Sequence, residues 1–180
     1  MNCNVQDCDP RLPDEVVDFL CDLLRRRRPN SLIVIDDQSA ASAGDHSWPA
    51  RLRPALPDGA RYVIETPDTW RDNAAERSEL ALLVCDPTAY STQAYRRLLG
   101  ELRDRRAAAV IVLNRPATGP YDPWQIGDFI AMGFRRVAGS QALPAGWSLY
   151  RYDIHDYKTT PDWLNKRYWA NPERWDQERW

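Results

Sequence analysis

The sequence lacks any long apolar run, and no stretch approaches the ~20 apolar residues that a helix needs to cross a bilayer. We therefore expect no membrane span. The first nine residues, MNCNVQDCD, are polar and acidic, whereas a secretory signal begins basic and continues apolar. With 43% hydrophobic and 28% charged residues, the composition is typical of a soluble globular protein, and we expect a cytoplasmic location.

Metal ligands are also scarce. The two histidines, His46 and His155, lie far in sequence from the cysteines, which show no Cys-x-x-Cys spacing: Cys3, Cys8, Cys21 and Cys85. The sequence thus predicts no metal site. Cys21 lies in an apolar helical pattern and Cys85 in an apolar strand pattern, where a thiol usually behaves as a small buried hydrophobe.

The chain has the size of one domain. At 180 residues, a single folded core can bury about 70% of the surface that the unfolded chain exposes. We predict one domain over residues 1–180, in which residues 13–154 form the core and residues 155–180 form an aromatic tail packed on it. The net charge of -2 argues against wholesale binding of nucleic acid.

Apolar periodicity predicts alternating helices and strands. Helical spacing indicates helices over residues 13–28, 91–106 and 122–133, the last with Asp122 as N-cap and Pro123 at its first position. Short apolar runs indicate strands at residues 32–35, 61–65, 80–86, 108–114, 134–137 and 147–154. The last run alternates, so we expect an antiparallel edge strand or ribbon, and residues 38–58 can hold one short helix at most.

This order of elements predicts an α/β fold: a three-layer, Rossmann-like sandwich with a mostly parallel sheet of about six strands and a C-terminal antiparallel strand. Ligands of such sheets bind outside the carboxyl ends of the strands. The residues expected at that edge are Asp36, Asp37, Glu65, Asp86 and Asn114. The opposite edge is expected to be basic, with solvated arginines at residues 25–28, 103–106 and 135–136.

Several segments resemble a class I S-adenosylmethionine-dependent methyltransferase over residues 13–154. The similarity lies in the opening helix followed by LIVID, then in LLVCD, in LLGELR leading to AVIVL, and in IAMGFRRV before the final antiparallel strand. The resemblance implies that Asp36 ends the first strand of the cofactor site and that Glu65 accepts hydrogen bonds from the ribose hydroxyls. It also implies that the substrate-side motif begins at Asp86.

The chain departs from the family where the cofactor loop is expected. Methyltransferases have closely spaced glycines after the first strand, whereas this chain reads DQSAASAG and has only Gly44, at its end. Without glycine a positive φ is costly, and added Cβ atoms obstruct the approach of a nucleotide. We assign no catalytic residue and predict no bound cofactor. Binding of S-adenosylmethionine in a distorted site, through Asp36, Asp37, Glu65 and Asp86, stays open.

Two other patterns near these acids have competing interpretations. Asp86-Pro-Thr-Ala-Tyr90 is faintly similar to the Asp-Pro-Pro-Tyr motif of amino-methyltransferases, but an Asp-Pro turn between strand and helix is the favoured interpretation. The same strands also resemble a receiver domain, whose clustered carboxylates hold Mg²⁺. Arg135 and Arg136 stand where a receiver has a lysine after its fifth strand, so we disfavour this alternative.

The C-terminal tail is unusually aromatic, with four of the eight tryptophans in the last 18 residues. Thr160-Pro161-Asp162 and Asn171-Pro172-Glu173 each predict the start of a short helix. The aromatic residues expected to contact either the core or a protein partner are Trp163, Tyr168, Trp169 and Trp175. From residue 151 onward the acidic and basic residues balance, which disfavours a nucleic-acid stacking platform. His155 is expected at the surface, with an acid or base role as its alternative.

Three functions remain open at this point. The favoured one is a methyltransferase-like domain that no longer performs the reaction and serves as a binding or interaction module, with a protein as its expected partner. The alternatives are an active S-adenosylmethionine-dependent methyltransferase with an atypical cofactor loop and a receiver-like signalling domain.

Overall fold

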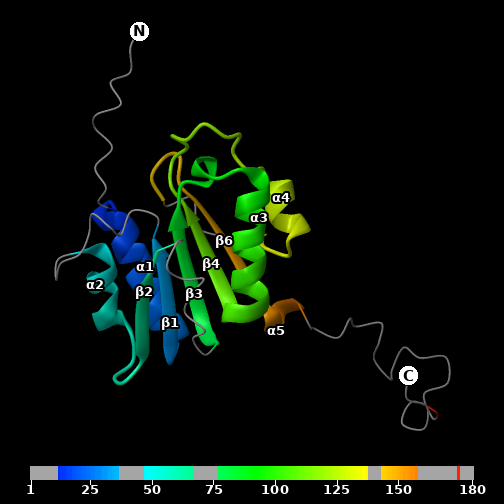
Figure 1. The fold of residues 1–180 in the computed structure, drawn as a ribbon. Helices are drawn as coiled ribbons and strands as arrows, with labels where there is room; N and C mark the ends of the chain where they lie inside the picture. Colours follow the sequence, from blue (N-terminus) through cyan, green and yellow to red (C-terminus); the bar gives the residue numbers. More distant parts are fainter. Residues whose placement is uncertain (1–11, 37–46, 67–76, 138–142, 158–173, 175–180) are drawn as a thin grey trace.

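The computed structural model describes residues 12–36, 47–66, 77–137, 143–157 and 174. These residues form a six-stranded sheet in the order β2-β1-β3-β4-β6-β5, with helices on both of its faces (Figure 1). The strands are β1 (Ser31–Asp36), β2 (Arg61–Glu65), β3 (Ser78–Cys85), β4 (Ala107–Asn114), β5 (Arg135–Arg136) and β6 (Ser148–Asp153). The predicted Rossmann-like α/β class is confirmed.

Helices precede, separate and follow the strands; α1 and α3 fall within the predicted helices, whereas α5 was not predicted. They are α1 (Asp14–Arg27), α2 (Trp48–Leu52), α3 (Thr92–Glu101), α4 (Ile126–Ala131) and α5 (Ile154–Tyr157). Short 3₁₀ turns η2 (Arg53–Ala55) and η3 (Pro87–Ala89) follow α2 and β3, and a π-helical turn η4 (Leu102–Arg106) joins α3 to β4. No helix in the described part of the chain is both long and apolar enough to cross a membrane.

Four strands run parallel and one antiparallel strand interrupts the series. β1 pairs in parallel with β2 and β3, and β3 pairs in parallel with β4. β6 pairs antiparallel with both β4 and β5, so it is the inner strand of a ribbon and not an edge strand. The predicted antiparallel ribbon is confirmed, and its edge alternative was wrong because β5 covers the outer side of β6, where Arg135 faces Arg151 and Arg136 faces Tyr150.

Alternating side chains divide the core between the two faces of the sheet. Leu32 and Val34 point to the face covered by α1 and α2, whereas Ile33 and Ile35 point to the face covered by α3 and α4. All four are at most 1% exposed. An apolar run without alternation is therefore what a strand covered on both faces requires, as expected for residues 32–35.

One helix begins later than predicted. Asp122 is not the N-cap of α4; the cap is Gln125, whose backbone N–H donates to Asp128 Oδ2 at 2.8 Å. The residue before the cap, Trp124, is buried against Tyr95 and Phe129, with ring centroids 4.8 and 5.3 Å away. Burial of this indole holds the chain in a non-helical path past Pro123, so the helix starts only after it.

Candidate functional site

The acids predicted at the carboxyl edge lie at the ends of neighbouring strands. Asp36 ends β1 and Glu65 ends β2, and their register is close because Ile35 pairs with Glu65. Asp86 follows β3 directly, and Asn114 ends β4 opposite Cys85. Asp37 lies outside the described residues.

The Asp36 carboxylate is closed between an indole and a guanidinium. Asp36 is 0% exposed; its Oδ2 accepts from Trp48 Nε1 at 2.9 Å and its Oδ1 accepts from Arg115 Nη2 at 3.1 Å. Trp48 opens α2, after the N-cap Ser47, and Arg115 is the first residue after β4. The Arg115 guanidinium carbon also lies 5.8 Å from the centre of the Trp147 ring.

Glu65 is held in a second buried ion pair. Both of its carboxylate oxygens accept from Arg106 Nη2, at 3.2 and 3.1 Å. The two residues are 4% and 8% exposed. The oxygens that the resemblance assigns to ribose hydroxyls thus have a cationic partner supplied by η4 of the same chain.

Asp86 organises the turn after β3. Its Oδ1 accepts from the backbone N–H and hydroxyl of Thr88, at 2.8 and 2.5 Å. Its Oδ2 accepts from the backbone N–H and hydroxyl of Thr118, at 2.8 and 2.6 Å, and from the Gly119 N–H at 3.1 Å. Burial alone would raise the pKa of Asp86, but the hydrogen bonds from Thr118 and Thr88 outweigh it and lower the pKa below its ordinary value.

The Asp-Pro turn interpretation of this segment is confirmed. Asp86 is the N-cap of η3, and Pro87 occupies its first position. The loop after β4 packs directly on this turn, because a Cβ atom added to Gly119 would lie 2.1 Å from the carbonyl oxygen of Thr88. Only a residue without a side chain fits there.

A chain of neutral hydrogen bonds lies beside the acids. The Tyr95 hydroxyl donates to Asn114 Oδ1 at 2.8 Å, and Asn114 Nδ2 donates to Ser148 Oγ at 3.3 Å. The thiol of Cys85 lies 3.6 Å from the Tyr95 hydroxyl and is buried, as expected from its apolar strand. These contacts tie β3, β4, α3 and β6 together at the carboxyl edge.

The predicted basic edge is only partly solvated. Arg106 is buried against Glu65, and the half-buried Arg103 donates to the carbonyl oxygen of Met132 at 2.7 Å. Arg25 pairs with Asp22 at 2.8 Å on the surface of α1. The arginines of this group that are exposed are Arg25, Arg26, Arg28, Arg105, Arg135 and Arg136. The prediction of solvated arginines was wrong for Arg106, because this side chain is buried against the Glu65 carboxylate at the end of β2.

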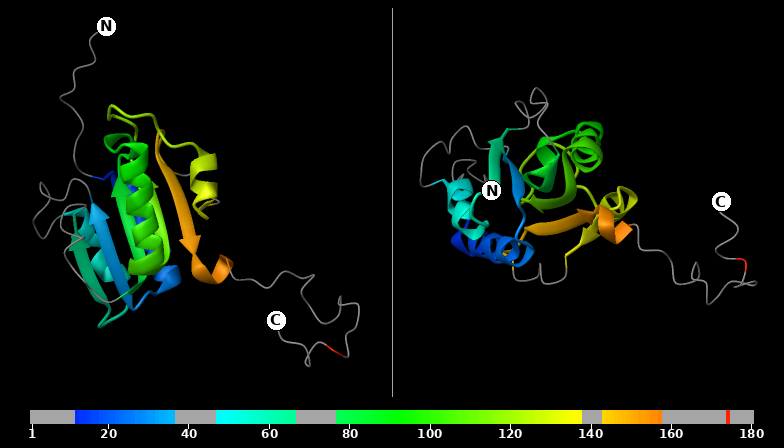
Figure 2. Two further views of the ribbon diagram at one scale, coloured as in Figure 1. Left: turned by 45° about the vertical axis from the view of Figure 1, so that its right-hand side comes forward. Right: turned by 90° about the horizontal axis from the view of Figure 1, so that it is seen from below.

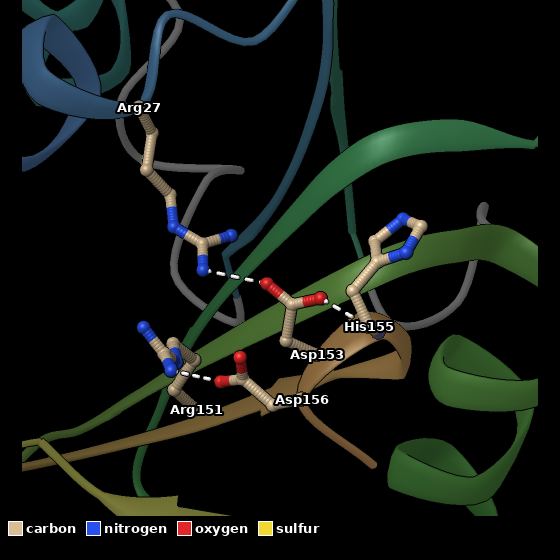
Figure 3. A network of polar contacts seen from close by, with 5 residues as sticks. All are labelled: Arg27, Arg151, Asp153, His155 and Asp156. Atoms are coloured by element: carbon tan, nitrogen blue, oxygen red, sulfur yellow. Dashed lines mark hydrogen bonds and ion pairs between the residues drawn. The ribbon is translucent and has the colours of Figure 1, made fainter. Parts of the chain in front are cut away.

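A polar cluster fixes the place where the chain leaves the sheet (Figure 3). Arg27, at the end of α1, donates to Asp153 Oδ2 at 2.7 Å, and the backbone N–H of His155 donates to Asp153 Oδ1 at 3.0 Å. Burial would raise the pKa of Asp153, but the Arg27 hydrogen bond and the His155 N–H lower it overall. Arg151 pairs with Asp156 in the same cluster. His155 itself is exposed, as expected.

The described residues contain no group of three or more His, Cys, Asp and Glu side chains that could hold a metal ion. The aromatic residues Trp163, Tyr168, Trp169 and Trp175 lie outside the described part of the chain. Sequence analysis missed Trp48 and Arg115, which hold Asp36, and it placed Arg106 in solvent instead of beside Glu65. No sequence motif marks these partners. The only signal was that a carboxylate at the end of a buried strand must have a hydrogen-bonding partner.

Comparison with known proteins identifies the family. Residues 14–180 match a family described as a family of unknown function, DUF6231. The chain belongs to this family. No curated protein matches the sequence. The family match covers the whole core and continues through the aromatic tail to the last residue.

Solved structures with a similar fold are methyltransferases. A structure of a putative O-methyltransferase from Nostoc punctiforme aligns with a TM-score of 0.51 at 11% identity, over 76% of this chain and 55% of that chain. An O-methyltransferase family protein from Burkholderia thailandensis aligns with a TM-score of 0.48 at 10% identity, over 76% and 55%. Magnesium protoporphyrin IX methyltransferase from Synechocystis PCC 6803, with bound SAM, aligns with a TM-score of 0.46 at 12% identity, over 76% of this chain and 77% of that chain.

These similarities concern the fold. The DUF6231 chain has a divergent fold of the class I S-adenosylmethionine-dependent methyltransferase type, as the resemblance in its sequence predicts. It spans about half the length of the first of these structures, 55%. The chain therefore has a methyltransferase-like fold, and its candidate site must be judged from its own residues.

Proposed function

We propose that this methyltransferase-like protein is a binding or interaction module that does not transfer methyl groups. The observation that carries the proposal is the closure of Asp36. Its two carboxylate oxygens accept from Trp48 and Arg115, and its side chain has no exposed surface. A cofactor could reach this carboxylate only by displacing Trp48 or Arg115.

The second acid of the cofactor site supports the same conclusion. A ribose would have to displace Arg106 from Glu65 to use its oxygens. Displacement would leave a guanidinium buried without its carboxylate, which costs about 3–5 kcal/mol. The described residues therefore do not fit S-adenosylmethionine, and the missing glycines after β1 point in the same direction.

The partner class in this proposal is a protein, which the aromatic residues of the C-terminal tail suit, and the net charge of -2 disfavours nucleic acid. Asp36, Glu65 and Asp86 act as structural residues in this proposal. Asp36 joins β1 to α2 and to the residue after β4, Glu65 joins β2 to η4, and Asp86 joins the turn after β3 to the loop after β4. A module of this kind needs no reacting group at the carboxyl edge.

Cofactor addition tests the proposal. S-adenosylmethionine and S-adenosylhomocysteine are added to the full chain at up to millimolar concentration, and the melting temperature and the heat of binding are measured. A ligand present at 100 times its dissociation constant would add about 2.7 kcal/mol to the free energy of unfolding. We expect no shift and no saturable heat, with a cofactor-binding methyltransferase measured in parallel as the positive control. Saturable binding or methyl transfer would establish the active enzyme with an atypical loop instead.

A further inference from the structure

Helix α4 presents two large apolar side chains to solvent. Ile126 is 49% exposed and Ile130, one turn later, is 60% exposed, while Phe129 between them is buried in the core. The large hydrophobic side chains exposed in the described part of the chain are Ile64, Tyr121, Ile126 and Ile130. Two isoleucines four positions apart on one helix form a continuous apolar stripe.

The segment that follows this helix packs against β6, the last strand before the chain leaves the core. A Cβ atom at Gly133, two residues after α4, would lie 3.5 Å from the Tyr152 ring near the end of β6. The ring of Phe134 lies 5.8 Å from that of Tyr152, and Arg135 pairs with Arg151. Figures 1 and 2 show α4 and α5 on the same side of the sheet, away from α1 and α2, with α5 at the lower end of β6 and α4 higher up. α5 ends at Tyr157.

The direction of α5 is fixed by contacts with the core. Asp153 accepts from Arg27 of α1 and from the His155 N–H at the start of α5, so the last strand and the first turn beyond it are held together. Ile154 packs partly against the cluster that contains Phe129 and Tyr152. The last described residues of α5 are therefore anchored at the β6–β5 side of the sheet, on which α4 also packs.

Residues 158–180, which follow α5, are rich in aromatic side chains that could cover the apolar stripe of Ile126 and Ile130. Residues 158–180 contain Trp163, Leu164, Tyr168 and Trp169, and the family match extends through them to residue 180. The family thus includes this segment in the same sequence unit as the core. α4 has six residues and is about 9 Å long, which a few extended residues span.

We propose that residues 158–180 of the same chain dock on α4, with tryptophan side chains covering Ile126 and Ile130. Apolar contact drives this docking, because the charges of the segment nearly cancel. The occupant is the chain's own tail and not a second copy, since the chain leaves the core after α5, on the same side of the sheet as α4, and needs no partner to reach it. The proposal is independent of whether S-adenosylmethionine binds.

Hydrogen exchange of the full chain, read on peptides from residues 158–180, tests the proposal. In the wild type we expect these amides to exchange at least about tenfold more slowly than unstructured amides. Ile126→Gln combined with Ile130→Gln is expected to remove this protection. Ile64→Gln is the matched control, because Ile64 is 44% exposed on β2 at the opposite edge of the sheet, and it is expected to leave the protection unchanged.

A reciprocal variant keeps the test decisive if the α4 variant loses its fold, which its melting temperature reports. Trp163→Gln combined with Trp169→Gln is expected to speed exchange in α4 while exchange in β3 and β4 stays slow. The protection is also expected to persist on tenfold dilution and at high salt. Unprotected tail amides in the wild type, protection that survives the α4 variant, or protection that disappears on dilution would each overturn docking within one chain.

Discussion

The Arg115 guanidinium donates to the Asp36 carboxylate at 3.1 Å, although Asp36 ends β1 and Arg115 follows β4. β3 lies between these two strands in the sheet. The ion pair therefore bridges the end of a third strand, and it is almost fully buried, with 7% and 0% of the two side chains exposed. Glu65 and Arg106 form a second buried pair, which joins β2 to the turn before β4.

Breaking the Asp36–Arg115 pair from one side should be costly. Arg115→Met and Asp36→Asn are each expected to lower the free energy of unfolding by about 3–5 kcal/mol, because each leaves a buried charge without its partner. In the double variant neither charge remains, and the amide that replaces the Asp36 carboxylate still offers an oxygen to Trp48. The loss in the double variant should be smaller than that of either single variant, as measured by urea unfolding in a double-mutant cycle.

The exposed pair Arg97–Glu101, 3.0 Å apart along α3, is the matched control for that cycle. Arg97→Met should cost no more than about 0.5 kcal/mol, because an exposed pair along a helix contributes little. Additive losses in the Asp36 and Arg115 cycle would show that the two side chains do not act as a pair.

Strand positions could be predicted because the information is local. The run LIVI at residues 32–35 lacks alternation, and its side chains are buried on both faces of the sheet. The start of α4 could not be predicted in the same way. Asp122 and Pro123 carry a helix-start pattern, but burial of Trp124 against Tyr95 depends on a helix far away in sequence.

In the candidate site, too, the features encoded locally could be predicted and those that depend on distant segments could not. The acids at the strand ends were found because each directly follows an apolar run. Their partners were missed because they come from distant segments: Trp48 is 12, Arg115 is 79 and Arg106 is 41 positions from its carboxylate. No local pattern encodes these pairings, which follow from strand order and side-chain length.

The contribution of Asp86 to stability should depend on pH. Its pKa is lowered from the ordinary value of 3.8 in the folded protein. A lowered pKa contributes stability that is present above the unfolded value and is lost as the pH falls through the folded value. Asp86→Asn should therefore be clearly less stable than the wild type at pH 7, and the gap should narrow below pH 3.8.

Thr118→Val provides a second measure of the same effect. The change keeps the shape of the side chain and removes the hydroxyl that donates to Asp86 Oδ2 at 2.6 Å. Unfolding free energies from denaturant titrations between pH 3 and pH 7 should show its deficit shrinking in acid as well. A deficit of constant size across this range, for both variants, would contradict the assigned role of the Asp86 carboxylate.

Two glycines should respond in opposite directions to the same substitution. Gly119→Ala should lower the free energy of unfolding by about 2–3 kcal/mol, because the new methyl group meets backbone that cannot move aside without disturbing the Asp86 hydrogen bonds. Gly127, in α4, has no atom within 4 Å of an added Cβ. Gly127→Ala should instead raise the free energy of unfolding by about 0.5–1 kcal/mol, since alanine is the better helix former. Thermal and urea unfolding of both variants measures the difference. Equal effects of the two changes on the free energy of unfolding would mean that the loop after β4 does not pack on the Thr88 carbonyl. The contact between this loop and the turn after β3 would then be refuted.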